Sequence, residues 1–371
     1  MSEIKVNSIK GVGASAAAIT VNNSDGTCTA NLSNRQNRNL IINGAMQVAQ
    51  RGTSSTSSGY HTVDRFRVDD GGHDEATTKE QADIASGTTP YTLGFRKSLK
   101  ITNGNQTGGA GASDYVQILS RLEAQDIANS GWNYTSTSSF ITLSFWVKSS
   151  VAQVFSGSVR SLDGTDQAFK FDTPSLSADT WTKVTKTISG NSNLTFDNNN
   201  DGGLDFYLFP FIGTTYTTAN SNTETWVTAT GGIYANDMTS TWWTTNDATF
   251  EITGVQLEVG SVATDFEHRS FGQELALCQR YFYNLTGSSS STYRWFYPIN
   301  TSGNFRRSPI EFPVSMRAAP TASNLAGNNN GSAGTPAGIQ HADVNSVEVH
   351  WDAAGSSHLV ELTQAYFSAE L

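Results

Sequence analysis

The chain has 371 residues and a net charge of -10, with 23 Lys and Arg against 33 Asp and Glu. An acidic balance with no basic run longer than Arg306-Arg307 argues against nucleic acid as a partner. No apolar stretch approaches the roughly 20 residues that a membrane-spanning helix needs, and residues 1–10 lack a secretory-signal pattern, so we expect neither membrane insertion nor export by such a signal.

The composition is typical of an all-β protein with short strands and many turns. Charged residues make up 15% of the chain, Gly reaches 33, and hydroxyl and amide side chains supply much of the polarity. Aromatic residues at 11% argue against disorder. At this length we expect two domains and an arm. The two cysteines, Cys28 and Cys278, are too few for a disulfide framework, so we expect free thiols made in a reducing cytoplasm.

Residues 1–39 are too poor in apolar residues to close a core alone. Short β-prone pieces alternate there, with the turn sequence Asn23-Ser24-Asp25-Gly26 between two of them. We expect an extended arm that lies against other chains, and the alternative is a frayed tail.

Residues 40–270 predict the first large domain, a β-sandwich. The run Arg38–Gly44 predicts a buried strand that ends in an Asn-Gly turn. Phe140–Lys148 gives the strongest strand signal, because Ile141, Leu143, Phe145 and Val147 fall on one face and Phe140, Thr142, Ser144, Trp146 and Lys148 on the other. Further strands are predicted at 63–68, 95–101, 115–123, 151–159, 168–171, 181–188 and 204–212, and a helical turn at 123–129.

The run Thr249–Asn284 predicts the joint between the two domains. Phe250, Ile252, Val255 and Leu257 alternate with polar residues as in a strand, and Gly254 interrupts the pattern where a bulge or a close backbone approach is expected. From Gln273 the apolar spacing becomes three and four, which predicts a short helix or a helix running into a strand.

Residues 271–371 predict a smaller C-terminal sandwich with strands at 292–298, 310–316, 346–351 and 358–369 and a loop over Asn324–Gly338. Pro313 and Pro320 should stand at a strand edge or end. The strand pattern that runs to Leu371 suits a packed trimeric tip, since a threefold axis would cover exposed strand edges.

Four strings of the sequence resemble the tail fibres of tailed phages, especially marine and cyanobacterial ones. They are NLIINGAMQVAQRGT (39–53), TVDRF (62–66), QLEVGSVATDFEHRSFGQELALCQRYFYN (256–284) and FPVSMRAAPT (312–321). The resemblance implies a homotrimeric virion protein that binds the host surface and is anchored on other virion proteins through residues 1–39. The pattern from Asn43 to Glu267 also resembles jelly-roll carbohydrate-binding modules.

A polar loop at 197–202 is the candidate metal site. Asp197, Asn199 and Asp201 place oxygen ligands at alternate positions before Gly202, as at the start of a calcium loop. The twelfth position is Leu208, so the bidentate carboxylate is missing and an Asn-rich turn is favoured. Any Ca²⁺ bound there would be structural, and no cofactor is otherwise predicted.

Four aromatic residues in one hydroxyl-rich segment are the candidate carbohydrate site: Trp226, Tyr234, Trp242 and Trp243. A rigid ring beside hydroxyls and amides suits a sugar, because the C-H face of a pyranose packs on the ring. The alternative is that these side chains fill the core. If Trp242 and Trp243 are adjacent on a strand they point to opposite faces, which favours one of the pair as a surface platform.

No arrangement of residues predicts catalysis. A glycan hydrolase needs two carboxylates across a cleft, but Asp64, Asp163, Asp166, Glu251, Glu258 and Glu267 show no diagnostic spacing. The six histidines form no metal-ligand pattern, and GxSxG, HExxH and P-loop motifs are absent. We expect a non-enzymatic, receptor-binding tail fibre in the virion tail; the alternatives are a structural decoration or tail-assembly protein and, with less support, a glycan hydrolase.

Overall fold

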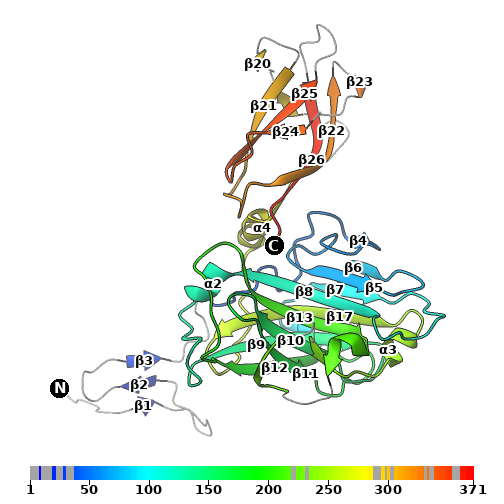
Figure 1. The fold of residues 1–371 in the computed structure, drawn as a ribbon, viewed down its shortest axis with the longest axis vertical. Helices are drawn as coiled ribbons and strands as arrows, with labels where there is room; N and C mark the ends of the chain where they lie inside the picture. The colour runs from blue at the N-terminus through cyan, green and yellow to red at the C-terminus, as the bar shows by residue number, and fades with distance from the viewer. Residues whose placement is uncertain are drawn as a thin grey trace.

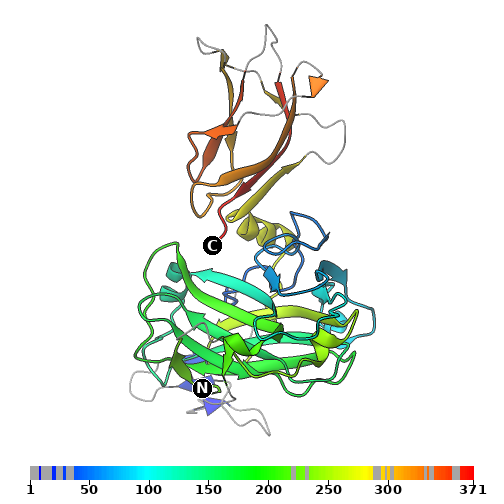
Figure 2. The same ribbon diagram turned by 45° about the vertical axis from the view of Figure 1, so that its right-hand side comes forward.

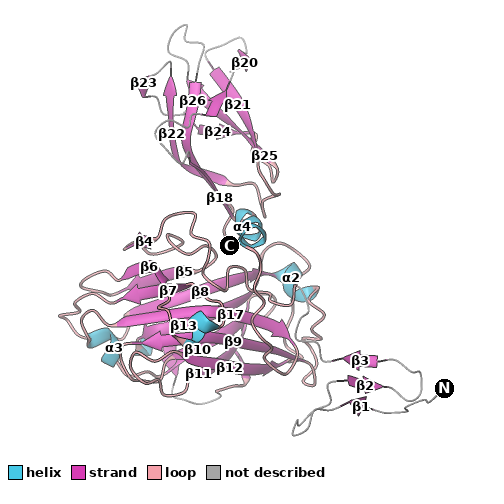
Figure 3. Cartoon of the chain, turned by 180° about the vertical axis from the view of Figure 1, so that it is seen from behind, coloured by secondary structure: helices cyan, strands magenta, loops and turns pink. Residues whose placement is uncertain are grey.

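The computed structural model describes residues 8–9, 19–21, 28–30, 37–218, 223–229, 234–286, 294–296, 299–300, 305–329, 332–333, 338–352 and 360–371. Strands dominate these residues and the helices are few and short (Figure 3). The prediction of an all-β fold is confirmed.

Two six-stranded antiparallel sheets form the large sandwich (Figures 1 and 2). Sheet I has the order β15 (Trp226–Thr228), β11 (Gln167–Asp172), β10 (Ser156–Ser161), β13 (Gly202–Ile212), β8 (Tyr115–Glu123), β5 (Arg67–Gly71). Sheet II has the order β12 (Thr182–Ser189), β9 (Phe140–Ser149), β17 (Thr249–Val259), β7 (Lys97–Thr102), β6 (Thr78–Asp83), β4 (Ser54–Ser55). The connections contain α1 (Thr89–Thr92), α2 (Ala124–Ala128), the 3-10 helix η1 (Thr214–Tyr216), α3 (Thr241–Thr244) and the parallel pair β14 (Thr217–Thr218) and β16 (Ala235–Asn236).

The alternating residues of β9 and β17 explain why these strands lie inside sheet II. On β9, Ile141, Leu143, Phe145 and Val147 are all fully buried in the core between the sheets. On β17 the register against β9 shifts between Thr253 and Gln256, around Gly254, whose φ is +63°. The bulge predicted at Gly254 is therefore confirmed, since a positive φ favours glycine.

The predicted strand over Arg38–Gly44 does not form. These residues make turns, because Asn43 has a φ of 59° and its side-chain amide donates to the carbonyls of Val48 and Asp64 at 2.9 and 2.8 Å. The strand predicted at 63–68 is displaced to β5, because Arg65 also has a positive φ.

The C-terminal body contains two further sheets. One has the order β18 (Phe282–Thr286), β26 (Val360–Ser368), β22 (Thr321–Asn329), β23 (Ser332–Ala333), with β19 (Arg294–Phe296) also on β26. The other has the order β20 (Ile299–Asn300), β21 (Phe305–Glu311), β25 (Ser346–Asp352), β24 (Gly338–Gln340). Its apolar cluster includes Leu285, Val349 and Phe367 and is separate from the core of the large sandwich.

Two expectations for the C-terminal body are wrong in part. Residues 324–329, predicted as loop, belong to β22, where register shifts against β26 accommodate the positive φ of Asn324. The strand predicted at 310–316 ends at Glu311. Pro313 follows β21 and Pro320 directly precedes β22, so both prolines stand at strand ends, as predicted.

The described residues of the arm form a small antiparallel sheet, β1 (Ser8–Ile9), β2 (Ile19–Val21) and β3 (Cys28–Ala30) (Figure 1). Val21 pairs with Cys28 in the register of β2 with β3. The turn predicted at 23–26 itself lies outside the described residues. What the arm contacts in a particle stays a prediction.

Helix α4 (Phe271–Gln279) connects the two bodies and runs directly into β18, as the change of period predicts (Figure 1). It begins with a capping box in which the Ser270 hydroxyl accepts from the Gln273 amide at 3.3 Å, and the Gln273 side chain accepts from the Ser270 amide at 3.1 Å. Cys278, on its buried face, is a free thiol; the side chain of Cys28 is not described.

A dense polar contact holds the C-terminal body to the sandwich. The carboxylate of Glu123, fully buried at the end of β8, accepts from both Arg280 Nε and Nη2 at 2.7 and 2.8 Å and from the Tyr281 hydroxyl at 2.6 Å. Glu370 pairs with Arg51 at 3.0 Å and with the buried Arg65. These pairs join residues distant in sequence and therefore restrain the two bodies relative to each other.

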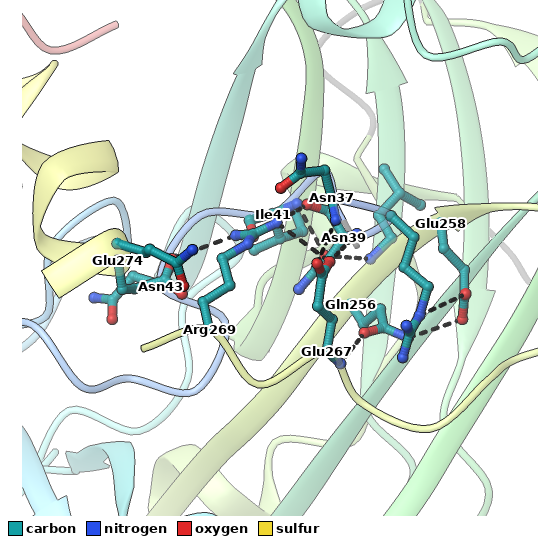
Figure 4. A network of polar contacts seen from close by, with 12 residues as sticks. Asn37, Asn39, Ile41, Asn43, Gln256, Glu258, Glu267, Arg269 and Glu274 are labelled. Carbon is teal, nitrogen blue, oxygen red and sulfur yellow. Dashed lines mark hydrogen bonds and ion pairs between the residues drawn. The ribbon is translucent and has the colours of Figure 1, made fainter. Parts of the chain in front are cut away.

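Figure 4 shows a second network, which closes the sandwich where the chain enters and leaves it. Glu267 accepts from the backbone amides of Asn37 and Asn39, and Arg269 donates to the backbone carbonyls of Asn39 and Ile41. The Asn39 side-chain oxygen accepts from the amides of Ile41 and Leu257, each at 3.0 Å. The entry segment therefore runs beside β17 without forming a strand.

Candidate functional site

The four aromatic residues predicted to bind sugar do not come together. Trp242 and Trp243 are fully buried, and their indole N-H groups donate to the carbonyls of Thr249 and Gly109 at 3.1 and 2.7 Å. The predicted surface platform is therefore wrong for this pair. The reason is that both residues lie on the short helix α3, not on a strand, so adjacent side chains need not face opposite sides.

The other two aromatic residues lie on different sides of sheet I. Trp226 packs partly buried against Phe169 of the core, with ring centroids 5.6 Å apart, and its N-H donates to the Ser189 carbonyl at 2.7 Å. Tyr234 packs outside the sheet against Tyr207 at 5.7 Å. No common plate exists for a sugar to cover.

The contacts of the predicted calcium loop are those of a turn. The Asn199 side-chain oxygen accepts from the Asp201 amide at 3.0 Å, and Asp201 lies 3.7 Å from Arg317 of the C-terminal body. Asp197 is exposed and its amide donates to Asp163 at 2.9 Å. Within the described ranges, no group of three or more His, Cys, Asp or Glu residues could hold a metal ion.

The carboxylates considered for hydrolysis have structural partners. Asp64 accepts from the Gln50 amide at 3.0 Å, Asp166 pairs with Arg160, and Glu258 accepts from Thr264 at 2.6 and 2.8 Å. Glu251 pairs with Lys148 on sheet II, and Glu267 accepts from the backbone amides of Asn37 and Asn39. Asp163 accepts from the Asp197 amide at 2.9 Å, and burial together with the nearby carboxylates of Asp197, Asp201 and Asp166 raises its pKa.

A different aromatic group lies on the outer face of sheet II. It consists of Tyr91, Trp146, Trp181 and Phe266, all half-buried around the buried Phe95, and we call it the aromatic face. Strand parity places Trp146 there, since its neighbours Phe145 and Val147 point into the core. Trp181 precedes β12, next to the cross-strand pair of Thr182 with Val147, so it lies beside Lys148.

The polar groups of the aromatic face are preorganised. Lys148 pairs with Glu251 at 2.8 Å, and the second oxygen of Glu251 accepts from the Ser98 hydroxyl at 2.9 Å. The Lys148 ammonium lies 5.3 Å from the Trp181 ring centre. Partly accessible indoles beside fixed donors and acceptors suit a sugar, whose apolar face packs on a ring while its hydroxyls form hydrogen bonds.

The sequence contained a signal for this face. In Phe140–Lys148, Trp146 falls on the polar side of the alternation, with Thr142, Ser144 and Lys148. A tryptophan on the face of a strand that points away from the core is not explained by packing in that core, which indicates a second role for its side chain. Trp146 and Trp181 are far apart along the chain and become neighbours only when β9 and β12 pair.

A pocket of about 780 Å³ lies next to this face, between residues 265–269, α4 and the C-terminal body. Phe266 belongs to both the pocket and the aromatic face. The remaining lining includes Arg38, Arg269, Arg280 and Val314. Arg269 forms ion pairs with Glu267 and Glu274, and Arg280 forms one with Glu123. Because these cations already have partners that connect the two bodies, the pocket is explained by the packing at the joint and is not assigned a ligand.

No family model and no curated protein matches the sequence. Solved structures that resemble the chain include a phage tailspike domain and carbohydrate-binding proteins. The enzymatically active domain of tailspike protein 4 of bacteriophage CBA120 is 11% identical, with a TM-score of 0.33 over 60% of this chain and 21% of that one. A putative sugar binding protein from Bacteroides thetaiotaomicron is 12% identical, with a TM-score of 0.32 over 60% of this chain and 100% of that one.

The xylan-binding domain from Paenibacillus barcinonensis is 11% identical, with a TM-score of 0.26 over 58% of this chain and 97% of that one. At such identities and TM-scores a function does not carry over from these structures to this chain. None of the helices in the described part of the chain is long and apolar enough to span a membrane.

Proposed function

We propose that this chain is a receptor-binding fibre protein of the virion tail of a tailed phage, and that the aromatic face of its sandwich binds a glycan on the host surface. The observation that carries the glycan site is the pair of half-buried tryptophans, Trp146 and Trp181, next to the fixed Lys148–Glu251 pair on the outer face of sheet II. The phage assignment is supported by the resemblance of the four sequence strings.

The proposal includes a homotrimer anchored on other virion proteins through residues 1–39. Three weak sugar sites on one fibre would raise the effective affinity without one tight site. Sedimentation of the full chain tests the oligomer, and a well-folded monomer would count against it. Labelling of intact particles with antibodies to the chain tests the location, because a tail protein would be accessible at the tail.

Substitution of the two tryptophans tests the glycan site. Full-length Trp146→Ala and Trp181→Ala should each weaken binding to the best ligand of a glycan array by about 2 kcal/mol, roughly thirtyfold, as truncation of a tryptophan anchor does. Thr185→Ala, an exposed residue of β12 without a ring, is the matched control and should bind normally. Normal binding by both tryptophan variants, with circular dichroism unchanged, would reject the aromatic face.

The proposal contains no catalytic step. Incubation of the chain with its ligand should release no reducing sugar, and sustained release would reassign it as a glycan hydrolase.

The joint gives specific support to a second candidate, a structural spacer. The buried contact of Glu123 with Arg280 and Tyr281 fixes the two bodies, as a rigid spacer requires. If particles carrying Trp146→Ala adsorb to host cells normally and no array glycan binds, the spacer is the better description.

A further inference from the structure

Two cations beside the aromatic face have no ion-pair partner among the described residues. The Lys148 charge is neutralised by Glu251, and that of Lys100 by Glu80 at 3.4 Å. Lys183 and Arg96 are exposed, and within the described part of the chain neither has an ion-pair partner. Two uncompensated cations on one face stand out in a chain whose net charge is -10.

Both cations lie next to the rings. Lys183 is directly opposite Trp146 in the register of β12 with β9, which puts their β-carbons about 5 Å apart on the same face. The Arg96 guanidinium lies 4.0 Å from the centre of the Tyr91 ring, and its Nη1 donates to the carbonyls of Tyr91 and Phe95 at 2.9 Å. Arg96 is therefore held against the aromatic group while other N-H groups stay available.

We propose that the aromatic face selects an anionic glycan, one that carries carboxylate or sulfate groups, over a neutral glycan of the same backbone. This inference rests on the proposed glycan site. The rings would take the apolar face of a sugar, while Lys183 and Arg96 would bind acidic groups of the same or the next residue. A charge-assisted hydrogen bond is about twice as strong as a neutral one, and a guanidinium matches a carboxylate or sulfate with two parallel bonds.

Lysine on an edge strand also has a purely structural explanation. β12 ends the order of sheet II, and charged side chains on such a strand prevent pairing with another sheet. That explanation predicts aggregation without Lys183 and no change in ligand preference. It gives no reason for the position of Arg96, which precedes an interior strand.

The test measures the full chain by calorimetry against two matched pairs of probes. One pair is an oligomer of a uronic acid and the same oligomer with its carboxyl groups reduced to alcohols; the other is a sulfated oligosaccharide and its desulfated form. We expect the charged member of at least one pair to bind ten times more tightly or better. Raising NaCl from 50 to 500 mM should weaken binding of that member only, because salt screens exposed charges.

Three variants complete the test. Lys183→Gln and Arg96→Gln should each weaken binding of the charged probe three- to tenfold and leave the neutral probe unchanged. Lys100 lies on the same face, but Glu80 already neutralises its charge. Lys100→Gln should therefore change the affinity for the charged probe and for the neutral probe less than twofold. Lys183→Arg should retain the preference.

The outcomes separate the two proposals. Equal affinity for charged and neutral members, or a preference that survives Lys183→Gln and Arg96→Gln together, overturns the selection for anionic glycans. Loss of binding to both members in Trp146→Ala still supports the aromatic face. If the wild-type chain binds neither these probes nor any array glycan, the glycan site itself is wrong and this inference falls with it.

Discussion

Replacing Glu123 by Gln should loosen the joint between the sandwich and the C-terminal body. The carboxylate is fully buried and receives two bonds from Arg280 and one from the Tyr281 hydroxyl. Removing one partner of a buried ion pair costs about 3–5 kcal/mol, but the Arg280 side chain is 31% exposed and can turn to water. We therefore expect a loss of about 2–4 kcal/mol in the free energy of unfolding, in line with the strength of hydrogen bonds to charged groups.

The pH dependence provides an internal control for Glu123→Gln. Burial raises the pKa of Glu123, but the hydrogen bonds from Arg280 and Tyr281 outweigh it, so the pKa lies below its ordinary value of 4.5. A depressed acid pKa contributes stability above the unfolded pKa and loses it as the pH falls through the folded pKa. The difference in the free energy of unfolding between wild type and variant should be largest at pH 7 and should shrink as the pH falls below 4.5, the ordinary pKa of the carboxyl.

Urea denaturation of the full chain measures this effect, with hydrogen exchange at the amides of β18 to show whether the joint opens first. Glu80→Gln, which breaks the partly exposed pair with Lys100, is the control and should cost less than about 1 kcal/mol. A Glu123→Gln variant within about 0.5 kcal/mol of wild type at pH 7, with unchanged exchange in β18, would refute the claim that this contact holds the two bodies.

Three further predictions concern the interior. Burial raises the pKa of Asp64 to about 6, so its ionisation opposes folding: the stability of wild type relative to Asp64→Asn should rise by about 1–2 kcal/mol from pH 8 to pH 5, measured by urea denaturation, and a flat difference contradicts this. Burial also raises the pKa of the Cys278 thiol, so in a Cys28→Ser background it should react with a thiol reagent at pH 8 only after unfolding. Gly254→Ala places a β-carbon 2.7 Å from a phenyl ring at a φ of +63° and should cost about 2–4 kcal/mol in thermal unfolding, against about 1 kcal/mol for Gly131→Ala, which has a φ of +85° and open space; equal costs would refute the steric account.

Local patterns were sufficient for much of the fold. Alternation predicted β9, a glycine within alternation predicted the bulge of β17, and the change of period predicted α4 and β18. Prediction from the local pattern failed at Arg38–Gly44, where a run of branched apolar residues is typical of a strand. Asn43 adopts a positive φ there and its amide bonds to distant carbonyls, which no local pattern encodes.

The site was harder to predict because it depends on pairing between strands. Trp242 and Trp243 are adjacent in a hydroxyl-rich segment, yet they lie on one turn of helix inside the core. Trp146 and Trp181 are 35 residues apart and meet only because β12 pairs with β9. Proximity along the chain therefore identified residues of the core, whereas the surface group can be identified only when the pairing register of β12 with β9 is known.

The network of Figure 4 explains what the tail-fibre resemblance measures. Asn39 and Asn43 belong to one of the recognised strings, and Glu267, Arg269 and Glu274 belong to another. Their side chains bond to each other and to backbone groups at the point where the chain enters and leaves the sandwich. Such residues are constrained by the closure of the fold, so a chain can share these strings and bind a different receptor. In the proposed receptor-binding role, receptor choice would depend on a surface outside these strings, where Trp146, Trp181 and Lys183 lie. Exchanging the residues at these three positions with those of another such fibre should exchange the glycan preference proposed above, whereas Asn39→Ala and Glu267→Ala should lower only the stability of the chain.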